Sequence, residues 1–188
     1  MMIRLQGLGH VLLRVLDVEQ SRTFYSTVLG LEVVEEDPEH GGVFMALEGH
    51  AHTLDLFPVP DPQAAQRPTP HRVGVHHVAF RVNSDEALRD AYFTLQEHGV
   101  KIARAVDHVS QKSIYFHDPD GNLIEIYYEL PNARELFRQG RHDRDEPLVF
   151  ERQVVSLGDA SDVEGATPGL PGSTPPCSIA LDTPRRDS

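Results

Sequence analysis

Apolar residues follow one order of patterns in the first third of the chain, and the same order recurs in the middle third. Residues 10–15, HVLLRV, and residues 77–82, HVAFRV, are short, valine-rich apolar runs of the kind found in buried strands. Each run is followed by a segment with helical spacing and then by three further strand-like runs. The pattern predicts a βαβββ unit that occurs twice.

The helices have sequence signals at their ends. Asp17, with Gln20 three residues later, resembles a capping box, and Gly30 is a typical helix stop. Gly99 closes the second helix, whose apolar face consists of Leu88, Ala91, Tyr92 and Leu95. The strands expected after the helices are residues 31–36, 42–48 and 52–57 in the first unit, and 100–106, 112–118 and 123–129 in the second.

Matching residues indicate that the two units are copies. His10 aligns with His77 at the start of the units, and Asp55 aligns with Glu125 near their ends. We therefore expect an α+β fold over residues 5–130, in which two βαβββ modules, residues 5–60 and 72–130, pair into an open sheet that encloses a cavity.

The remaining chain has a different character. Residues 131–155 form an expected C-terminal extension with one short helix in NARELFRQ. From residue 156 to 188 the sequence is rich in glycine, proline and serine and has no periodicity. Such a segment buries too little apolar surface to offset its ordering entropy, so we expect a disordered tail.

Charge and composition narrow the function classes. The chain has 188 residues and a formal charge of −12, so binding to nucleic acid or to an anionic membrane is not expected. A single cysteine excludes a disulfide framework. Because the N-terminal sequence has no long apolar run, we expect neither a signal peptide nor a membrane span. We expect a cytoplasmic protein. Its 11 histidines are notable, because imidazole is the commonest metal ligand in proteins.

Strand alternation separates an apolar face from a polar face in each module. His10 and His77 begin the two modules on the polar face, and Glu125 lies on the polar face of the last strand. If the polar faces line one cavity, two imidazoles and one carboxylate can bind a metal ion from one side. This donor set is the facial triad of non-haem Fe(II) oxygenases.

The duplicated βαβββ unit resembles the vicinal oxygen chelate superfamily, which includes glyoxalase I, extradiol dioxygenases, epimerases and antibiotic-resistance proteins. Residues 108–125, HVSQKSIYFHDPDGNLIE, resemble the type I extradiol dioxygenase signature at every specified position. The resemblance covers about residues 5–130 and is closest to the one-domain form of that family.

The resemblance implies roles for single residues. It implies that His10, His77 and Glu125 bind the metal, Fe(II) or alternatively Mn(II), and that His108 and Tyr115 hydrogen-bond the substrate and intermediate. A proton-transfer histidine matches His52 best, with His50 as the alternative. The implied reaction is extradiol ring cleavage of a catechol-type aromatic by O₂, in a protein expected to be a homo-oligomer.

Two other functions remain open at this point. Asp55 occupies the place where glyoxalase I-like and epimerase-like members supply a fourth ligand, so a metal-dependent isomerase or lyase is one alternative. The other is a metal-free protein that sequesters an aromatic drug, as bleomycin-resistance members do. The presence of both His108 and Tyr115 favours the dioxygenase.

Overall fold

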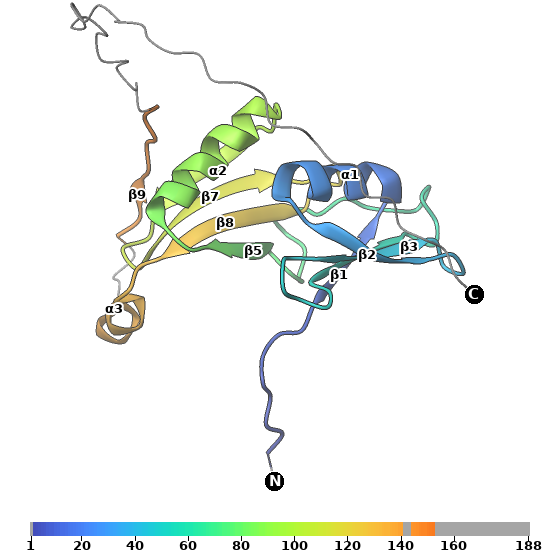
Figure 1. The fold of residues 1–188 in the computed structure, drawn as a ribbon, viewed down its shortest axis with the longest axis horizontal. Helices are drawn as coiled ribbons and strands as arrows, with labels where there is room; N and C mark the ends of the chain where they lie inside the picture. The colour runs from blue at the N-terminus through green and yellow to red at the C-terminus, as the bar shows by residue number, and fades with distance from the viewer. Residues whose placement is uncertain (1, 141–143, 153–188) are drawn as a thin grey trace, which may run out of the picture. The chain divides into compact units, whose positions relative to one another are not determined.

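Two βαβββ units make up most of the chain that the computed structural model describes, which is residues 2–140 and 144–152 (Figure 1). The expected α+β class and the duplicated unit are confirmed. The expected tail at residues 156–188 lies outside the described residues. The first unit consists of β1 (Val11–Val15), α1 (Val18–Leu29), β2 (Glu32–Asp37), β3 (Gly42–Ala46) and β4 (Leu54–Pro58). The second consists of β5 (His77–Val82), α2 (Asp85–Glu97), β6 (Ile102–Asp107), β7 (Gln111–His117) and β8 (Leu123–Glu129).

Each unit forms a sheet of its own. The strand order is β1-β4-β3-β2 in the first sheet and β5-β8-β7-β6-β9 in the second. The first and last strands of each unit run parallel to one another, and the other pairs are antiparallel. Consequently β1 and β5 are edge strands, and among the described strands each pairs on one side only. Among the strands that the structure describes, those of the two modules therefore form two separate sheets.

Local sequence explains where the helices begin and end. The Asp17 carboxylate accepts a hydrogen bond from the Gln20 amide at 3.0 Å, and the Ser84 hydroxyl caps α2 in the same way through the Ala87 amide. Gly30 ends α1 with φ of 70°, a left-handed conformation that glycine adopts without strain. No helix in the described residues is long and apolar enough to cross a bilayer.

The extension after β8 contains the short helix expected from NARELFRQ. This helix, α3, spans Ala133–Gln139. The chain then returns to the second sheet as β9 (Glu146–Pro147), which pairs with β6 in an antiparallel register. No sequence pattern predicted this short strand, which brings residue 145 back toward the second module.

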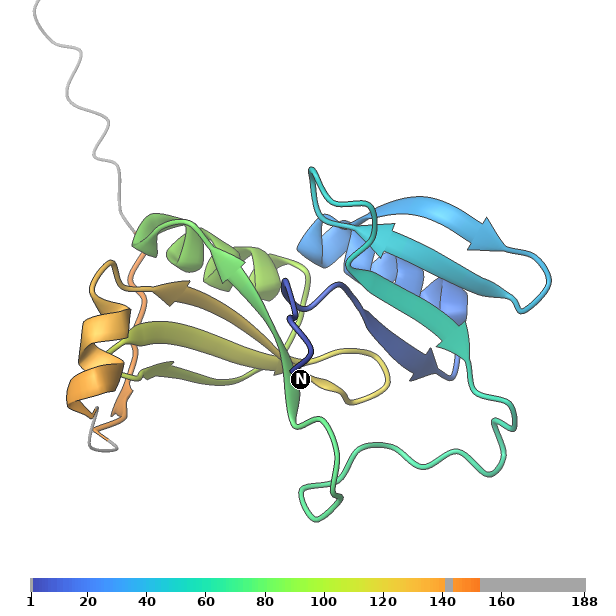
Figure 2. The ribbon, with the colours of Figure 1, turned by 90° about the horizontal axis from the view of Figure 1, so that it is seen from below.

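Each sheet has one face covered by its helix and one open face (Figures 1 and 2). The side chains that pack into the core include Val15, Val43, Met45, Leu54, Leu56, Ile114, Phe116, Ile124 and Ile126. Asp55 alternates with buried leucines in β4, and Glu125 alternates with buried isoleucines in β8. Both carboxylates therefore point to the open face of their sheet, away from the helix.

The turn after β7 connects the two modules. The Tyr25 hydroxyl of α1 donates a hydrogen bond to Asp118 Oδ2 at 2.8 Å, and the Ser21 hydroxyl lies 3.4 Å from Asp120 Oδ2. The Leu16 amide, just before α1, also donates to Asp120 at 3.3 Å. All of these carboxylates and hydroxyls are buried. The Asp-Pro-Asp-Gly turn thus fixes the position of α1 in addition to reversing the chain.

Replacing Tyr25 with phenylalanine is expected to lower the free energy of unfolding by about 1–3 kcal/mol, because a buried carboxylate loses a hydrogen-bond donor. Burial, followed by the charge of Asp118, raises the pKa of the Tyr25 phenol. The unfolded chain loses this proton near pH 10 while the folded chain keeps it, so the free energy of unfolding falls as pH rises through that range. The phenylalanine variant has no phenol at position 25, so its free energy of unfolding does not fall for this reason. The difference in unfolding free energy between wild type and variant should therefore shrink above pH 10.

Urea unfolding of both proteins at pH 7 and pH 10.5 measures this effect. Tyr128→Phe, in β8, is the matched control with the same chemical change. Equal stability of wild type and Tyr25→Phe at pH 7 would show that the contact between Tyr25 and Asp118 contributes nothing.

Candidate metal centre

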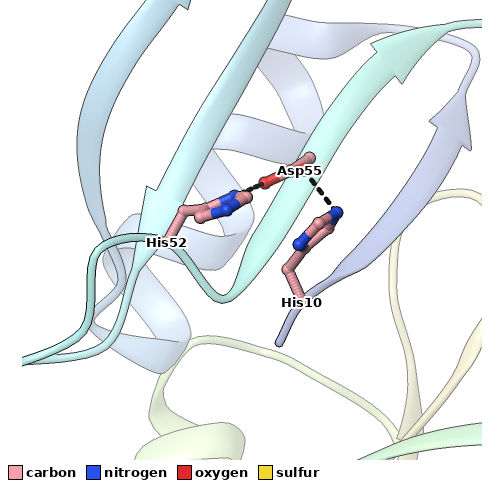
Figure 3. A group of neighbouring side chains, drawn as sticks. All are labelled: His10, His52 and Asp55. Atoms are coloured by element: carbon pink, nitrogen blue, oxygen red, sulfur yellow. Dashed lines mark hydrogen bonds and ion pairs between the residues drawn. The ribbon is translucent and has the colours of Figure 1, made fainter. Parts of the chain in front are cut away.

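The first module brings two imidazoles to one buried carboxylate (Figure 3). Asp55 Oδ1 lies 2.8 Å from His52 Nδ1, and Asp55 Oδ2 lies 3.5 Å from His10 Nε2. The two rings stack with their centroids 4.3 Å apart. Asp55 is only 2% exposed, so its charge has little solvent to stabilise it and depends on these partners. One ligand atom from each residue lies within 4.8 Å of the others, and the donor set suits a divalent cation.

This arrangement distinguishes His52 from His50. His52 lies in the loop that enters β4 and contacts Asp55, three residues later. His50 is exposed, and its Nδ1 contacts the main-chain oxygen of Glu48 instead. Of the two histidines, therefore, only His52 belongs to this cluster.

The second module holds His77 against Glu125. His77 begins β5, Glu125 lies in the neighbouring parallel strand β8, and the register Ala79↔Glu125 puts both residues on the same face. His77 Nε2 lies 2.9 Å from Glu125 Oε2. Glu125 is 3% exposed, which makes it a second buried carboxylate whose charge is met by an imidazole.

A row of hydrogen bonds extends from this pair. The Tyr115 hydroxyl lies 2.8 Å from Glu125 Oε1 and 3.0 Å from His108 Nε2. On its other side, His108 Nδ1 lies 2.8 Å from Asp145 Oδ1. Burial, with the nearby Glu125 carboxylate as the next cause, raises the pKa of Tyr115 to about 12, so the phenol keeps its proton at neutral pH. Asp145, His108, Tyr115, Glu125 and His77 thus form one continuous row of polar contacts.

A tight turn positions His108. Val109 has φ of 69°, a left-handed conformation that a β-branched residue rarely adopts and that costs about 1–3 kcal/mol. The Val109 amide donates to Asp107 Oδ1 and the His108 amide donates to the Gln111 carbonyl, both at 2.8 Å. These bonds hold the strained residue in place and leave His108 nearly buried beside Tyr115.

Sequence reasoning did not find three residues of this site. Gln111 donates to Glu125 Oε1 at 3.1 Å, and the Arg104 guanidinium lies 4.2 Å from the centre of the Tyr115 ring. Asp145 contacts His108 from the extension. Gln111 and Arg104 could have been inferred from strand parity once β6, β7 and β8 were aligned, because Tyr115 is in register with both Arg104 and Glu125. No pattern in the sequence indicated that Asp145 would contact His108.

The structure divides the expected metal ligands into two groups. His10 lies with His52 and Asp55, whereas His77 lies with Glu125. Among the described residues, His10, His52 and Asp55 form the single set of three potential ligands whose donor atoms are all within 4.8 Å of one another. In the described part of the chain, His10, His77 and Glu125 do not form such a set; His10 lies with the first sheet, and His77 and Glu125 lie in the second.

Comparison with known proteins gives a consistent set of relatives. Residues 7–126 match a family model described as the Glyoxalase/Bleomycin resistance protein/Dioxygenase superfamily. The chain is 32% identical over 163 residues to a biphenyl-2,3-diol 1,2-dioxygenase of Rhodococcus globerulus, covering 82% of this chain and 84% of that protein. It is 29% identical over 150 residues to a catechol-2,3-dioxygenase of Bacillus subtilis, covering 80% of this chain and 49% of that protein.

A solved structure agrees with these matches. A glyoxalase/dioxygenase from Nostoc punctiforme superposes with a TM-score of 0.56 and 26% identity, covering 66% of this chain and 92% of that one. The family match, residues 7–126, contains two half-sites. The first half-site is the cluster of His10, His52 and Asp55, and the second is His77 and Glu125 with Tyr115 and His108.

Proposed function

Because the chain belongs to the Glyoxalase/Bleomycin resistance protein/Dioxygenase superfamily, we propose that it is an Fe(II)-dependent extradiol dioxygenase that cleaves a catechol-type aromatic with O₂. The observation that carries the proposal is the hydrogen-bonded row of Glu125, Tyr115 and His108. In this row a phenol and an imidazole lie beside the buried Glu125 carboxylate, the proposed metal ligand, where a substrate that gains and loses protons would need them. The similarity to a biphenyl-2,3-diol dioxygenase supports the same reaction class.

The metal would be held by His10, His77 and Glu125, with Fe(II) as the proposed ion and Mn(II) as the alternative. The fit rests on the donor chemistry: two imidazoles and a carboxylate that is 3% exposed and paired with His77. When bound, such an ion would act as a Lewis acid that activates the diol substrate and O₂. Tyr115 and Gln111 orient the carboxylate through its Oε1, which leaves Oε2 directed toward His77.

Two copies of the chain would complete this ligand set. The two half-sites lie on the open faces of separate sheets, and β1 and β5 both pair on one side only. An unpaired edge strand is a common place for a second copy to dock, and twofold symmetry would form two such contacts at once. We propose that His10 of one copy meets His77 and Glu125 of another, so that each dimer contains two sites.

Proton transfer would be divided between the half-sites. Asp55 holds His52 through Nδ1, which leaves Nε2 to accept a proton from a substrate hydroxyl. Tyr115 and His108 would donate to the oxygen atoms that come from O₂, and Asp145 would hold the His108 ring in place. The chain thus has one base on the first module and one proton-donating row on the second.

Replacing His108 with alanine is expected to leave the metal bound and to slow turnover by about 10²–10⁴-fold, the usual contribution of a positioned acid or base. Iron content and the rate of O₂ uptake measure the two effects separately. His98→Ala, at the exposed end of α2, is the matched control. Normal turnover of His108→Ala would remove His108 from the mechanism.

A second candidate function is favoured by one observation. Asp55 lies with His10 and His52, in the set of three potential ligands that a single chain does assemble. If Asp55 binds the metal, a ligand-rich centre on the first module would suit a metal-dependent isomerase or lyase of the glyoxalase type. His52 would then be a ligand and not a base.

One experiment separates these functions. The protein is reconstituted anaerobically with Fe(II), and catechol, biphenyl-2,3-diol and a hemithioacetal are then added in air-saturated buffer. The dioxygenase proposal expects one O₂ consumed per diol and a yellow ring-opened product. Turnover of the hemithioacetal without O₂ uptake would instead support the isomerase. A protein that retains neither iron nor manganese yet binds aromatic compounds would contradict both.

A further inference from the structure

A cavity of about 570 Å³ lies away from both half-sites, where the end of β1, the linker between the modules and the turn after β7 meet. Figure 2 shows this linker as a long loop from the end of β4 to the start of β5. The cavity lining includes three arginines, Arg14 of β1 and Arg67 and Arg72 of the linker. Three guanidinium groups around one cavity contrast with the formal charge of −12 of the whole chain.

Main-chain oxygens hold the three arginines in place. An Arg14 guanidinium nitrogen donates to the Pro58 carbonyl at 2.9 Å, and one from Arg67 donates to the Pro119 carbonyl at 2.8 Å. Arg72 reaches the Gln66 carbonyl at 3.5 Å. In the part of the chain that the structure describes, none of the three is in an ion pair. Each guanidinium has five N–H donors, so these contacts leave donors for a ligand.

The two carboxylates of the lining are already engaged. Asp61 Oδ1 accepts from the Gln63 and Ala64 amides of its own turn. Both oxygens of Asp120 face the Leu16 amide, and Asp120 Oδ2 also faces the Ser21 hydroxyl. The lining thus combines three cations, each anchored by a neutral carbonyl, with two anions that are turned toward main-chain and hydroxyl donors. The local charge favours an anionic occupant.

We infer that this cavity binds a small organic anion through a carboxylate or phosphate group. The planar guanidinium fork matches both oxyanions with paired hydrogen bonds. The volume of the cavity is in the range of small-molecule sites. Arg14 is four residues from His10 along the same strand face, about 13 Å at the rise of a strand. The lining of the cavity contains none of His10, His52 and Asp55, so the anion site is distinct from the first half-site. The inference does not depend on the proposed dioxygenase activity.

Isothermal titration calorimetry on the full chain tests the inference, with sodium phosphate and sodium benzoate as probes and sodium chloride at matched ionic strength. We expect one of the two probes to bind saturably, with one ion per chain. Arg67→Gln and Arg72→Gln should each weaken that binding by about tenfold or more, the loss of a charge-assisted hydrogen bond. Saturation by phosphate alone identifies a phosphate-bearing ligand, and saturation by benzoate alone identifies a carboxylate.

Arg138→Gln is the matched control, because it makes the same charge change at an exposed position of α3. If Arg67→Gln fails to fold by circular dichroism, Arg67→Lys replaces it, since lysine keeps the charge but loses the fork. The inference is overturned if neither probe saturates, or if Arg138→Gln weakens binding as much as the cavity variants do.

Discussion

Replacing Glu125 with alanine is expected to remove stoichiometric metal from the purified protein and to abolish O₂-dependent ring cleavage. Glu125 is the proposed anionic ligand, it is 3% exposed, and its Oε2 lies 2.9 Å from His77 Nε2. Loss of the Glu125 side chain removes one proposed ligand, and it also removes the carboxylate that orients His77, another proposed ligand. Because loss of an outer partner alone weakens a metal site by about 10–100-fold, we expect a fall in metal affinity of at least about a hundredfold here.

Iron content after anaerobic reconstitution and O₂ uptake with a catechol measure this effect. Glu129→Ala, at the end of the same strand, is the matched control, because Glu129 is exposed and pairs with Arg81 at 3.9 Å. Glu125→Gln keeps the size of the side chain and guards against misfolding of the alanine variant. An unchanged iron content in a folded Glu125 variant would refute this residue as a ligand.

Local sequence was sufficient to predict the elements of each module. The Asp17 cap, the Gly30 stop and the face of the α2 helix depend on neighbours within a few residues, and all three are confirmed. Strand parity also predicted that Glu125 would point away from the apolar side of its sheet, because alternation is a property of any strand. Duplication of the unit followed from comparing the chain with itself.

Contacts between residues that are far apart in the sequence could not be predicted from local sequence. The contact of Asp145 with His108 spans 37 residues and depends on how the extension returns to β6. The Asp-Pro-Asp-Gly sequence indicates a turn and nothing more. The buried hydrogen bond between Tyr25 and Asp118 depends on how the modules pack, so it could not be predicted from that sequence. Whether two modules share one sheet or form two depends on edge strands that look alike in sequence.

The division of the site between two sheets also changes how the metal ligands should be tested. A single substitution in either half removes the activity whether the site forms within one chain or between two. The two possibilities differ only when variants of opposite halves are combined. His10 and Glu125 are suited to this comparison, because they lie in different modules and belong to different clusters.

Mixing His10→Ala with Glu125→Ala is therefore expected to restore activity that neither variant has alone. In a mixed dimer whose sites each combine the first module of one copy with the second module of the other, one site receives both substitutions and the other receives none. Random pairing makes half of the dimers mixed, so about one quarter of wild-type activity and iron should return after joint refolding. His10→Ala mixed with His52→Ala, both in the first module, is the control that should stay inactive. If the first mixture is as inactive as its components, the metal site does not form between two copies.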